Sequence, residues 1–237
     1  MITSLENKTV KELTRLHQKK YRTDSFLLSD EKLIQEALKT SHLKKLVYTG
    51  EQPFEFEDSL EVSKEVLNKI AGREGLSYLG VSSFIEEKDD YGKRILLLDH
   101  LQDPLNIGRI MEAAQHFGFD SLVLSEGCAE IYNEKCLLAC KEGIYHLNIC
   151  HKDLDKEVIR LKEKGYRVYA TGLSDDTKEM HEVKAEDKMA FILGNEGSGV
   201  RKELMDLSDN VMKIDMRNID SLNVGMAAAI IMYQFRI

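Results

Sequence analysis

Hydrophobic residues along the chain occur in two patterns, as short unbroken runs and as stripes at helical spacing. The unbroken runs at 95–98, within the segment 94–99, and at 190–193 are typical of strands in a sheet that is covered on both faces. Between such runs, segments such as 153–164 carry apolar residues every three or four positions, as amphipathic helices do. This alternation predicts a parallel sheet with helices on both faces. The expected strands are 94–99, 121–124, 145–149, 166–171, 190–193 and 211–214, and the expected helices are 105–117, 133–140, 153–164 and 222–235.

Residues 1–85 show the same two patterns over shorter segments and predict a smaller α/β unit. The segment 86–93 is polar and highly charged and contains Gly92 near its end, which is typical of a linker. We therefore expect two domains, 1–85 and 94–237, joined by 86–93. In the first domain the expected helices are 5–20, 30–40 and 63–71, and the expected strands are 26–28, 43–49 and 77–84.

The net charge of −8 argues against a protein that coats nucleic acid with its whole surface. Residues 1–50 contain 10 Lys and Arg against 6 Asp and Glu, whereas residues 51–237 contain 23 against 35. A basic end on an acidic body is compatible with an RNA or phosphate partner. A solvated helix face explains such a run of charge as well, and is the more common case. The candidate RNA-binding residues are Lys8, Lys11, Arg15, Lys19, Lys20 and Arg22.

The apolar runs are all shorter than the ~18 residues that a membrane-spanning helix needs, and the first residues have no apolar signal core. Cys128, Cys136, Cys140 and Cys150 contain no Cys-x-x-Cys pair, so buried reduced thiols are favoured over a metal site. These features predict a cytoplasmic protein with no membrane partner and no metal.

A cluster of glycines, 194–199, follows the run 190–193, and a second polar loop follows the strand expected at 211–214. In open α/β sheets, ligands bind at such loops at the carboxyl ends of strands. The cluster is not a dinucleotide fingerprint, and Val200-Arg201 stands where a P-loop requires Lys-Ser/Thr, so a nucleoside triphosphate is not expected. The exposed amides of the loop could hold a less anionic ligand. On spacing alone, a simple strand-to-helix turn is the favoured interpretation.

Three segments, taken together, resemble motifs of the SpoU/TrmH family of RNA methyltransferases, within the SPOUT superfamily. They are 103–108 (Asp-Pro-Leu-Asn-Ile-Gly), 193–199 (Leu-Gly-Asn-Glu-Gly-Ser-Gly) and 214–216 with 221–224 (Ile-Asp-Met and Ser-Leu-Asn-Val). The resemblance implies an α/β trefoil knot over 94–237. Residues 1–85 are more loosely similar to the small RNA-binding domain, related to ribosomal protein L30e, that often accompanies it.

The resemblance also implies a reaction, the transfer of a methyl group from S-adenosyl-L-methionine to a ribose 2′-hydroxyl of ribosomal or transfer RNA. The family is homodimeric. The nearly all-apolar segment 222–235 must be buried, either in the core or in a dimer interface. Carried over by position, the cofactor-binding residues are Leu193, Gly194, Asn195, Gly197, Ile214, Met216, Leu222 and Asn223.

At two positions the sequence departs from the family pattern. The family's catalytic arginine, six residues after the motif asparagine Asn106, corresponds to Glu112, and a second arginine corresponds to Leu138. Arg109 lies one helical turn before Glu112 and either substitutes for the arginine or forms a surface ion pair. Glu112 either acts as a weak base or marks a catalytically silent homologue that only binds RNA.

Three further residues complete the catalytic set. Glu196 either orders its loop, which we favour, or faces the substrate. Asn106 is expected in a helix-capping role, a catalytic role or both, and Ser221 either caps the last helix or lines the substrate side with Asn223. The candidate catalytic residues are therefore Asn106, Arg109, Glu112, Glu196, Ser221 and Asn223.

Overall fold

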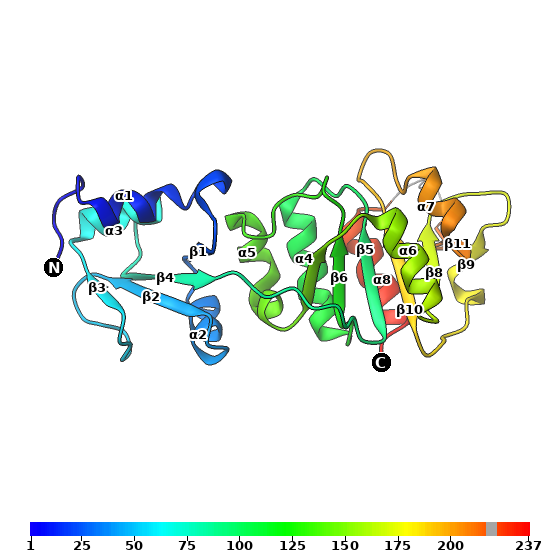
Figure 1. The fold of residues 1–237 in the computed structure, drawn as a ribbon, viewed down its shortest axis with the longest axis horizontal. Coiled ribbons are helices and arrows are strands. Elements are labelled where there is room, and N and C mark those ends of the chain that lie inside the picture. The colour runs from blue at the N-terminus through cyan, green and yellow to red at the C-terminus, as the bar shows by residue number, and fades with distance from the viewer. Residues whose placement is uncertain (217–221) are drawn as a thin grey trace. The chain divides into compact units, whose positions relative to one another are not determined.

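The computed structural model describes residues 1–216 and 222–237, which fold into two compact units (Figure 1). The first unit contains Met1–Ile85 and Tyr132–Tyr145, and the second contains Glu86–Ile131 and His146–Ile237. These units differ from the expected domains in two respects. Residues 132–145 belong to the first unit, and the segment expected as a linker belongs to the second. Asn148 holds that segment in place, because it accepts from the amide of Lys88 at 3.0 Å and donates to the carbonyl of Lys88 at 2.9 Å.

The sheet of the first unit has four strands in the order β1-β4-β2-β3. β4 pairs with β1 and β2 in antiparallel fashion, and β3 pairs with β2 in parallel. β3 was not expected from the sequence, because three residues are too few to show a period of two. The strands are β1 (Ser25–Leu28), β2 (Leu43–Tyr48), β3 (Ser59–Glu61) and β4 (Tyr78–Ser83).

The helices of the first unit begin at polar caps. The side chain of Asp30 accepts from the amide of Leu33 at 3.2 Å, and the side chain of Ser63 accepts from the amide of Val66 at 3.3 Å. The helix expected at 5–20 is shorter, because the chain leaves it after Arg15 and forms a separate 3₁₀ turn. The helices are α1 (Lys8–Arg15), η1 (Lys19–Tyr21), α2 (Glu31–Lys39) and α3 (Lys64–Ala71).

Residues 132–145 complete the first unit with α5 (Glu134–Cys140) and η2 (Lys141–Tyr145). The ring of Tyr132 stacks on Phe84 with centroids 4.2 Å apart, and the hydroxyl of Tyr145 donates to Ser82 Oγ at 2.9 Å. Because Tyr145 is still in a 3₁₀ turn, the strand expected at 145–149 was wrong in its bounds. That strand, β7, covers Asn148–His151.

The second unit has a seven-stranded sheet in the order β7-β6-β5-β10-β8-β11-β9, and all its pairings are parallel. The parallel sheet predicted from the sequence is confirmed. The two-residue edge strand β9 was not expected. Besides β7, the strands are β5 (Arg94–Leu98), β6 (Ser121–Leu124), β8 (Arg167–Thr171), β9 (Lys178–Glu179), β10 (Met189–Leu193) and β11 (Asn210–Lys213).

Helices cover both faces of this sheet (Figure 1). Alternate strand residues, such as Ile95 and Ile192, join one core with α6 and α7. On the other face α4 and α8 contact each other, and the ring of Phe235 lies 4.8 Å from that of Phe191. The helices are α4 (Pro104–His116), α6 (Leu154–Glu163), α7 (Lys202–Leu207) and α8 (Val224–Gln234), and the 3₁₀ turn η3 covers Met180–Glu182.

Two sequence-based expectations were that the chain has no membrane-spanning helix and no metal site. No helix in the described residues is long and apolar enough to cross a bilayer. Within the same residues, no group of three or more His, Cys, Asp or Glu side chains could hold a metal ion. The four cysteines are free thiols, and Cys128 is the least buried of them.

Arg94 ties the end of the chain to the first strand of the second unit. Its side chain is buried, donating from Nε to the carbonyl of Phe235 and from Nη1 to the carbonyl of Asp187, both at 2.8 Å. Burial lowers the pKa of this guanidinium, although the group stays charged because an arginine pKa lies so high.

We expect Arg94→Met to lower the free energy of unfolding by about 2–4 kcal/mol, because two carbonyls lose charged donors. Lys93→Met is the matched control. It removes an exposed ion pair with Asp187, which typically contributes about 0–1 kcal/mol. Urea unfolding followed by circular dichroism measures both changes, and equal changes in the two variants would contradict the role of Arg94.

Candidate functional site

A cavity of about 970 Å³ lies at the carboxyl ends of β8, β10 and β11. β8 lies between the other two strands in the sheet, so the loops that follow β10 and β11 face each other across the end of β8. The cavity is lined by all eight residues that the sequence analysis selected for the cofactor, namely Leu193, Gly194, Asn195, Gly197, Ile214, Met216, Leu222 and Asn223.

The loop after β10 is a tight turn held by Asn195. The main chains of Asn195 and Gly199 exchange two hydrogen bonds of 3.1 and 2.9 Å, and the Asn195 side-chain amide donates to the carbonyl of His100 at 2.8 Å. Its side-chain oxygen accepts from the amides of Gly197 and Ser198 at 2.9 and 3.2 Å. These two amides are therefore not free for a ligand, because Asn195 Oδ1 already accepts from both.

Gly194 is where the turn closes on itself. A Cβ atom placed there would lie 2.0 Å from both the carbonyl carbon of Gly199 and the amide nitrogen of Val200. No side chain fits at that distance without moving the backbone. By contrast, a Cβ atom on Gly197 would meet Asn195 Oδ1 at 3.5 Å, an ordinary contact.

One buried amide, Asn106, connects the three motif segments. Its Nδ2 donates to Glu196 Oε1 at 3.1 Å, and its Oδ1 accepts from Asn223 Nδ2 at 3.1 Å. Asn106 does not cap α4. That position belongs to Asp103, whose carboxylate accepts from the amide of Leu105 at 2.9 Å. Asn223 caps α8 by accepting from the amides of Gly225 and Met226.

Glu196 has the structural role favoured from the sequence. Besides Asn106, its carboxylate accepts from the amides of Gln102 and Asp103 at 3.4 and 3.3 Å, where α4 begins. Burial raises the pKa of Glu196, but the hydrogen bonds from its own amide, Asn106, Gln102 and Asp103 outweigh burial, so the pKa lies below its usual value. A charged acceptor at a helix N-terminus is favourable, which fixes the loop to α4.

A second connection, absent from the sequence analysis, joins the same loop to β5 and α6. The buried carboxylate of Asp99 accepts from the amide of Arg201 at 3.0 Å and from its Nε at 2.9 Å, and Arg201 Nη2 donates to Asp155 at 3.1 Å. The residue that excluded a P-loop therefore braces the far end of the glycine-rich loop. The only sign of this role in the sequence was that a basic residue, Arg201, follows closely after the glycine-rich loop.

Arg109 and Glu112 lie outside the cavity lining. Arg109 is exposed on α4 beside the start of α8, since a Cβ atom on Gly225 would lie 3.8 Å from the Cβ of Arg109. Glu112 is half-buried one turn further on, and in the described parts of the chain no ion pair joins it to Arg109. Ser221 lies outside the described residues. The N-cap position of α8 is held by Asn223.

Sequence reasoning missed part of the cavity wall. The end of β8 contributes Thr171, Gly172 and Leu173, β9 contributes Glu179, and α7 contributes Met205. The first three follow directly from the sheet order, because β8 lies between the two strands whose loops were identified. Glu179 and Met205 had no motif or period that could have selected them.

Comparison with known proteins agrees with this site. Residues 93–233 match the SpoU rRNA Methylase family, and residues 7–75 match the MRM3-like substrate binding domain. The chain is 31% identical to the 23S rRNA (guanosine(2553)-2′-O)-methyltransferase RlmP of Bacillus subtilis, over 99% of this chain and 98% of the relative. The protein therefore belongs to the SpoU family of RNA methyltransferases.

Solved structures agree with the fold. The crystal structure of an rRNA methyltransferase from Sinorhizobium meliloti matches with a TM-score of 0.88 and 24% identity, covering 98% of this chain and 95% of that one. A second structure of an rRNA methyltransferase from that organism, described as bound to AdoMet, matches with a TM-score of 0.86, 24% identity and the same coverage. At 24% identity, this similarity shows that the fold is shared.

We expect Gly194→Ala to lower the free energy of unfolding by about 1–3 kcal/mol, since the new methyl group overpacks the closed turn. Gly197→Ala, three residues along the same loop, changes it by no more than about 0.5 kcal/mol. Thermal unfolding of the two variants measures the difference. Equal stability would show that the turn is not closed at Gly194.

Proposed function

We propose that the protein is an S-adenosyl-L-methionine-dependent ribose 2′-O-methyltransferase that acts on ribosomal RNA in the cytoplasm. The observation that carries this proposal is the cavity of about 970 Å³, formed by the family motifs at the strand ends. Its volume is in the range of ligand and cofactor sites. The function of the B. subtilis relative, methylation of 23S rRNA, supports the choice of ribosomal over transfer RNA.

The side chains of the cavity suit this cofactor. Leu193, Ile214 and Leu222 offer apolar surface for a flat adenine ring. Glu179 Oε1 pairs with Lys213 at 2.7 Å and Asp215 Oδ2 lies 2.7 Å from His181 Nδ1, which leaves the other oxygen of each carboxylate for a ligand that carries a sulfonium and an ammonium group. When bound, the cofactor supplies an electrophilic methyl group. The contribution of the chain is to hold and orient the cofactor with the two loops that Asn195 and Asn106 fix.

We propose that Arg109 binds the RNA phosphate beside the reacting ribose. Its guanidinium is exposed, always charged and suited to paired hydrogen bonds with phosphate. Asn106 and Glu196 act as positioning residues, since each is occupied by hydrogen bonds within the site. Glu112 lies next to this position on α4 and would repel phosphate, which places the RNA strand on the Arg109 side.

The basic side chains of the first unit divide into two groups. On α1, Lys8 pairs with Glu12 at 3.8 Å and Lys11 pairs with Glu6. Lys19 and Lys20, on η1, have no carboxylate partner within the residues that the structure describes. We propose that Arg15, Lys19, Lys20 and Arg22 contact RNA phosphates, in the part of the chain that matches a substrate binding domain.

We further propose that the second unit contains the family's trefoil knot and forms a homodimer through α8. Met226, Ile230 and Tyr233 recur at helical spacing along α8 and are 58%, 37% and 58% exposed in the single chain. An apolar stripe of this kind on a helix next to the site suits a second copy of the chain.

Calorimetric titration with S-adenosyl-L-methionine should show binding, and transfer of labelled methyl groups to unmodified ribosomal RNA should follow. We expect Arg109→Ala to keep cofactor binding and lower methyl incorporation at least about tenfold. Lys156→Ala, which removes an exposed charge from α6, should leave incorporation unchanged. Absence of cofactor binding would refute the proposed methyltransferase function. Cofactor binding without methyl incorporation would favour the alternative, a catalytically silent homologue.

Sedimentation velocity tests the dimer. We expect the native chain to sediment as a dimer at micromolar concentration and Met226→Glu as a monomer, because a buried unpaired carboxylate is unfavourable in an interface. Glutamate suits the first turn of a helix, so α8 itself is preserved. Ile159→Glu is the control, since Ile159 is 48% exposed on α6. A dimeric Met226→Glu protein would contradict the proposed interface.

A further inference from the structure

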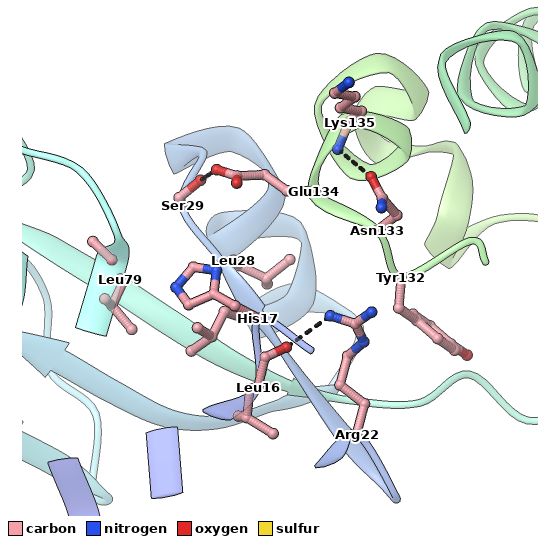
Figure 2. Close-up of a pocket in the computed structure, with 12 residues that line it drawn as sticks. Leu16, His17, Arg22, Leu28, Ser29, Leu79, Tyr132, Asn133, Glu134 and Lys135 are labelled. Carbon is pink, nitrogen blue, oxygen red and sulfur yellow. Dashed lines mark hydrogen bonds between the residues drawn. The ribbon is translucent and has the colours of Figure 1, made fainter. Parts of the chain in front are cut away.

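The first unit contains a second cavity, of about 260 Å³, that no catalytic residue lines (Figure 2). It lies between the segment after α1, the end of β1 and the start of α5, all within one compact unit. Its volume is close to the lower limit of small-molecule sites, about 300 Å³, which suits one planar ring system rather than a whole cofactor.

The walls of this cavity combine apolar surface with polar groups. Leu16, Leu28 and Leu79 form apolar wall, and the ring of His17 lies among them (Figure 2). His17 Nε2 lies 2.7 Å from the carbonyl of Ile70, so this nitrogen is the donor. In the neutral ring the other nitrogen, Nδ1, is then an acceptor. The cavity thus has flat apolar surface beside a hydrogen-bond acceptor.

The start of α5 adds donors on the opposite side of the cavity. Asn133 caps α5 with its side-chain oxygen, which accepts from the amide of Lys135 at 3.0 Å (Figure 2). Its Nδ2 is thereby left as a donor, and Lys135 lines the same side of the cavity. Donors and acceptors around an apolar slot are the complement of a nucleobase edge and face.

Positive charge lies beside the cavity. Leu16, His17 and Arg22 line it, and the residues between them form η1. Residues 13–23 contain Arg15, Lys19, Lys20 and Arg22 and no Asp or Glu. Of the residues that line the cavity, Glu134 carries a carboxylate, and its Oε1 accepts from Ser29 Oγ at 3.4 Å. A ligand that carries negative charge next to a flat ring therefore fits this place best.

We propose that the cavity receives one unpaired nucleobase of the RNA substrate, while Lys19 and Lys20 bind the phosphates on either side of that nucleotide. This inference rests on the proposed function in taking RNA as the substrate. It assigns the first unit a base-specific contact in addition to charge attraction, because an apolar slot lined by His17 and Asn133 contributes nothing to binding a phosphate backbone alone.

The test compares two labelled strands by fluorescence anisotropy with the full chain. One is a 12-nucleotide single-stranded RNA of mixed sequence, and the other is an abasic ribose-phosphate strand of the same length and charge. We expect the strand with bases to bind about tenfold more tightly, since each stacked base adds this order of affinity. Ser29→Trp, which fills the cavity, and His17→Ala should each remove most of this difference and leave binding of the abasic strand unchanged.

Gln18→Ala is the matched control, because Gln18 is exposed next to His17 but does not line the cavity. It should keep the full preference for bases. Circular dichroism checks that each variant is folded, and His17 is exposed enough for its replacement to be tolerated.

Equal binding of the two strands by the native chain, or an undiminished preference in both folded cavity variants, would overturn the inference. These results are independent of the enzyme assay. Methyl transfer without a base preference would refute only the proposed nucleobase site. A base preference without cofactor binding would refute only the proposed methyltransferase function.

Discussion

The site depends on one side-chain amide, that of Asn106. An amide group offers a donor and an acceptor in one plane, and Asn106 uses the donor for Glu196 and the acceptor for Asn223. With only 3% of the residue exposed, water does not compete for these bonds. The distance between the loop after β10 and the first turn of α8 is therefore set by a group of fixed geometry. Since Glu196 and Asn223 both line the large cavity, its shape follows from this arrangement.

The order of strands explains why segments distant in sequence meet. β5, β10, β8 and β11 are neighbours and run in parallel, so the loops at their carboxyl ends share one edge of the sheet. The Asp99–Arg201 pair joins the residues after the glycine-rich loop to the end of β5. The loop is thus held at both ends, which keeps it in place without a metal or a disulfide among the described residues.

The sequence predicted the architecture well where long apolar runs carried it. The parallel sheet and its covering helices follow from runs such as 95–98 and from helical stripes such as that of α6. Short elements were not predicted, because β3 and β9 have too few residues to show the alternation of a strand. Family motifs selected the cavity lining, but they gave no information on Thr171 or Glu179, whose position depends on the sheet order. The side chain of Asn195 also accepts from two loop amides that were candidates for ligand binding, and no sequence pattern indicates this hydrogen bonding.

The first unit is built from two separate stretches of the chain, and this affects how the protein can be made. Tyr132 covers Phe84 and Tyr145 bonds to Ser82, so the unit lacks part of its packing until residue 145 of 237 has been synthesised. Domains usually complete themselves from the amino end as the chain emerges from the ribosome. Here residues 1–85 remain without their full packing, and with Phe84 uncovered, while β5, α4 and β6 are translated. The two units consequently finish folding in an overlapping interval rather than one after the other.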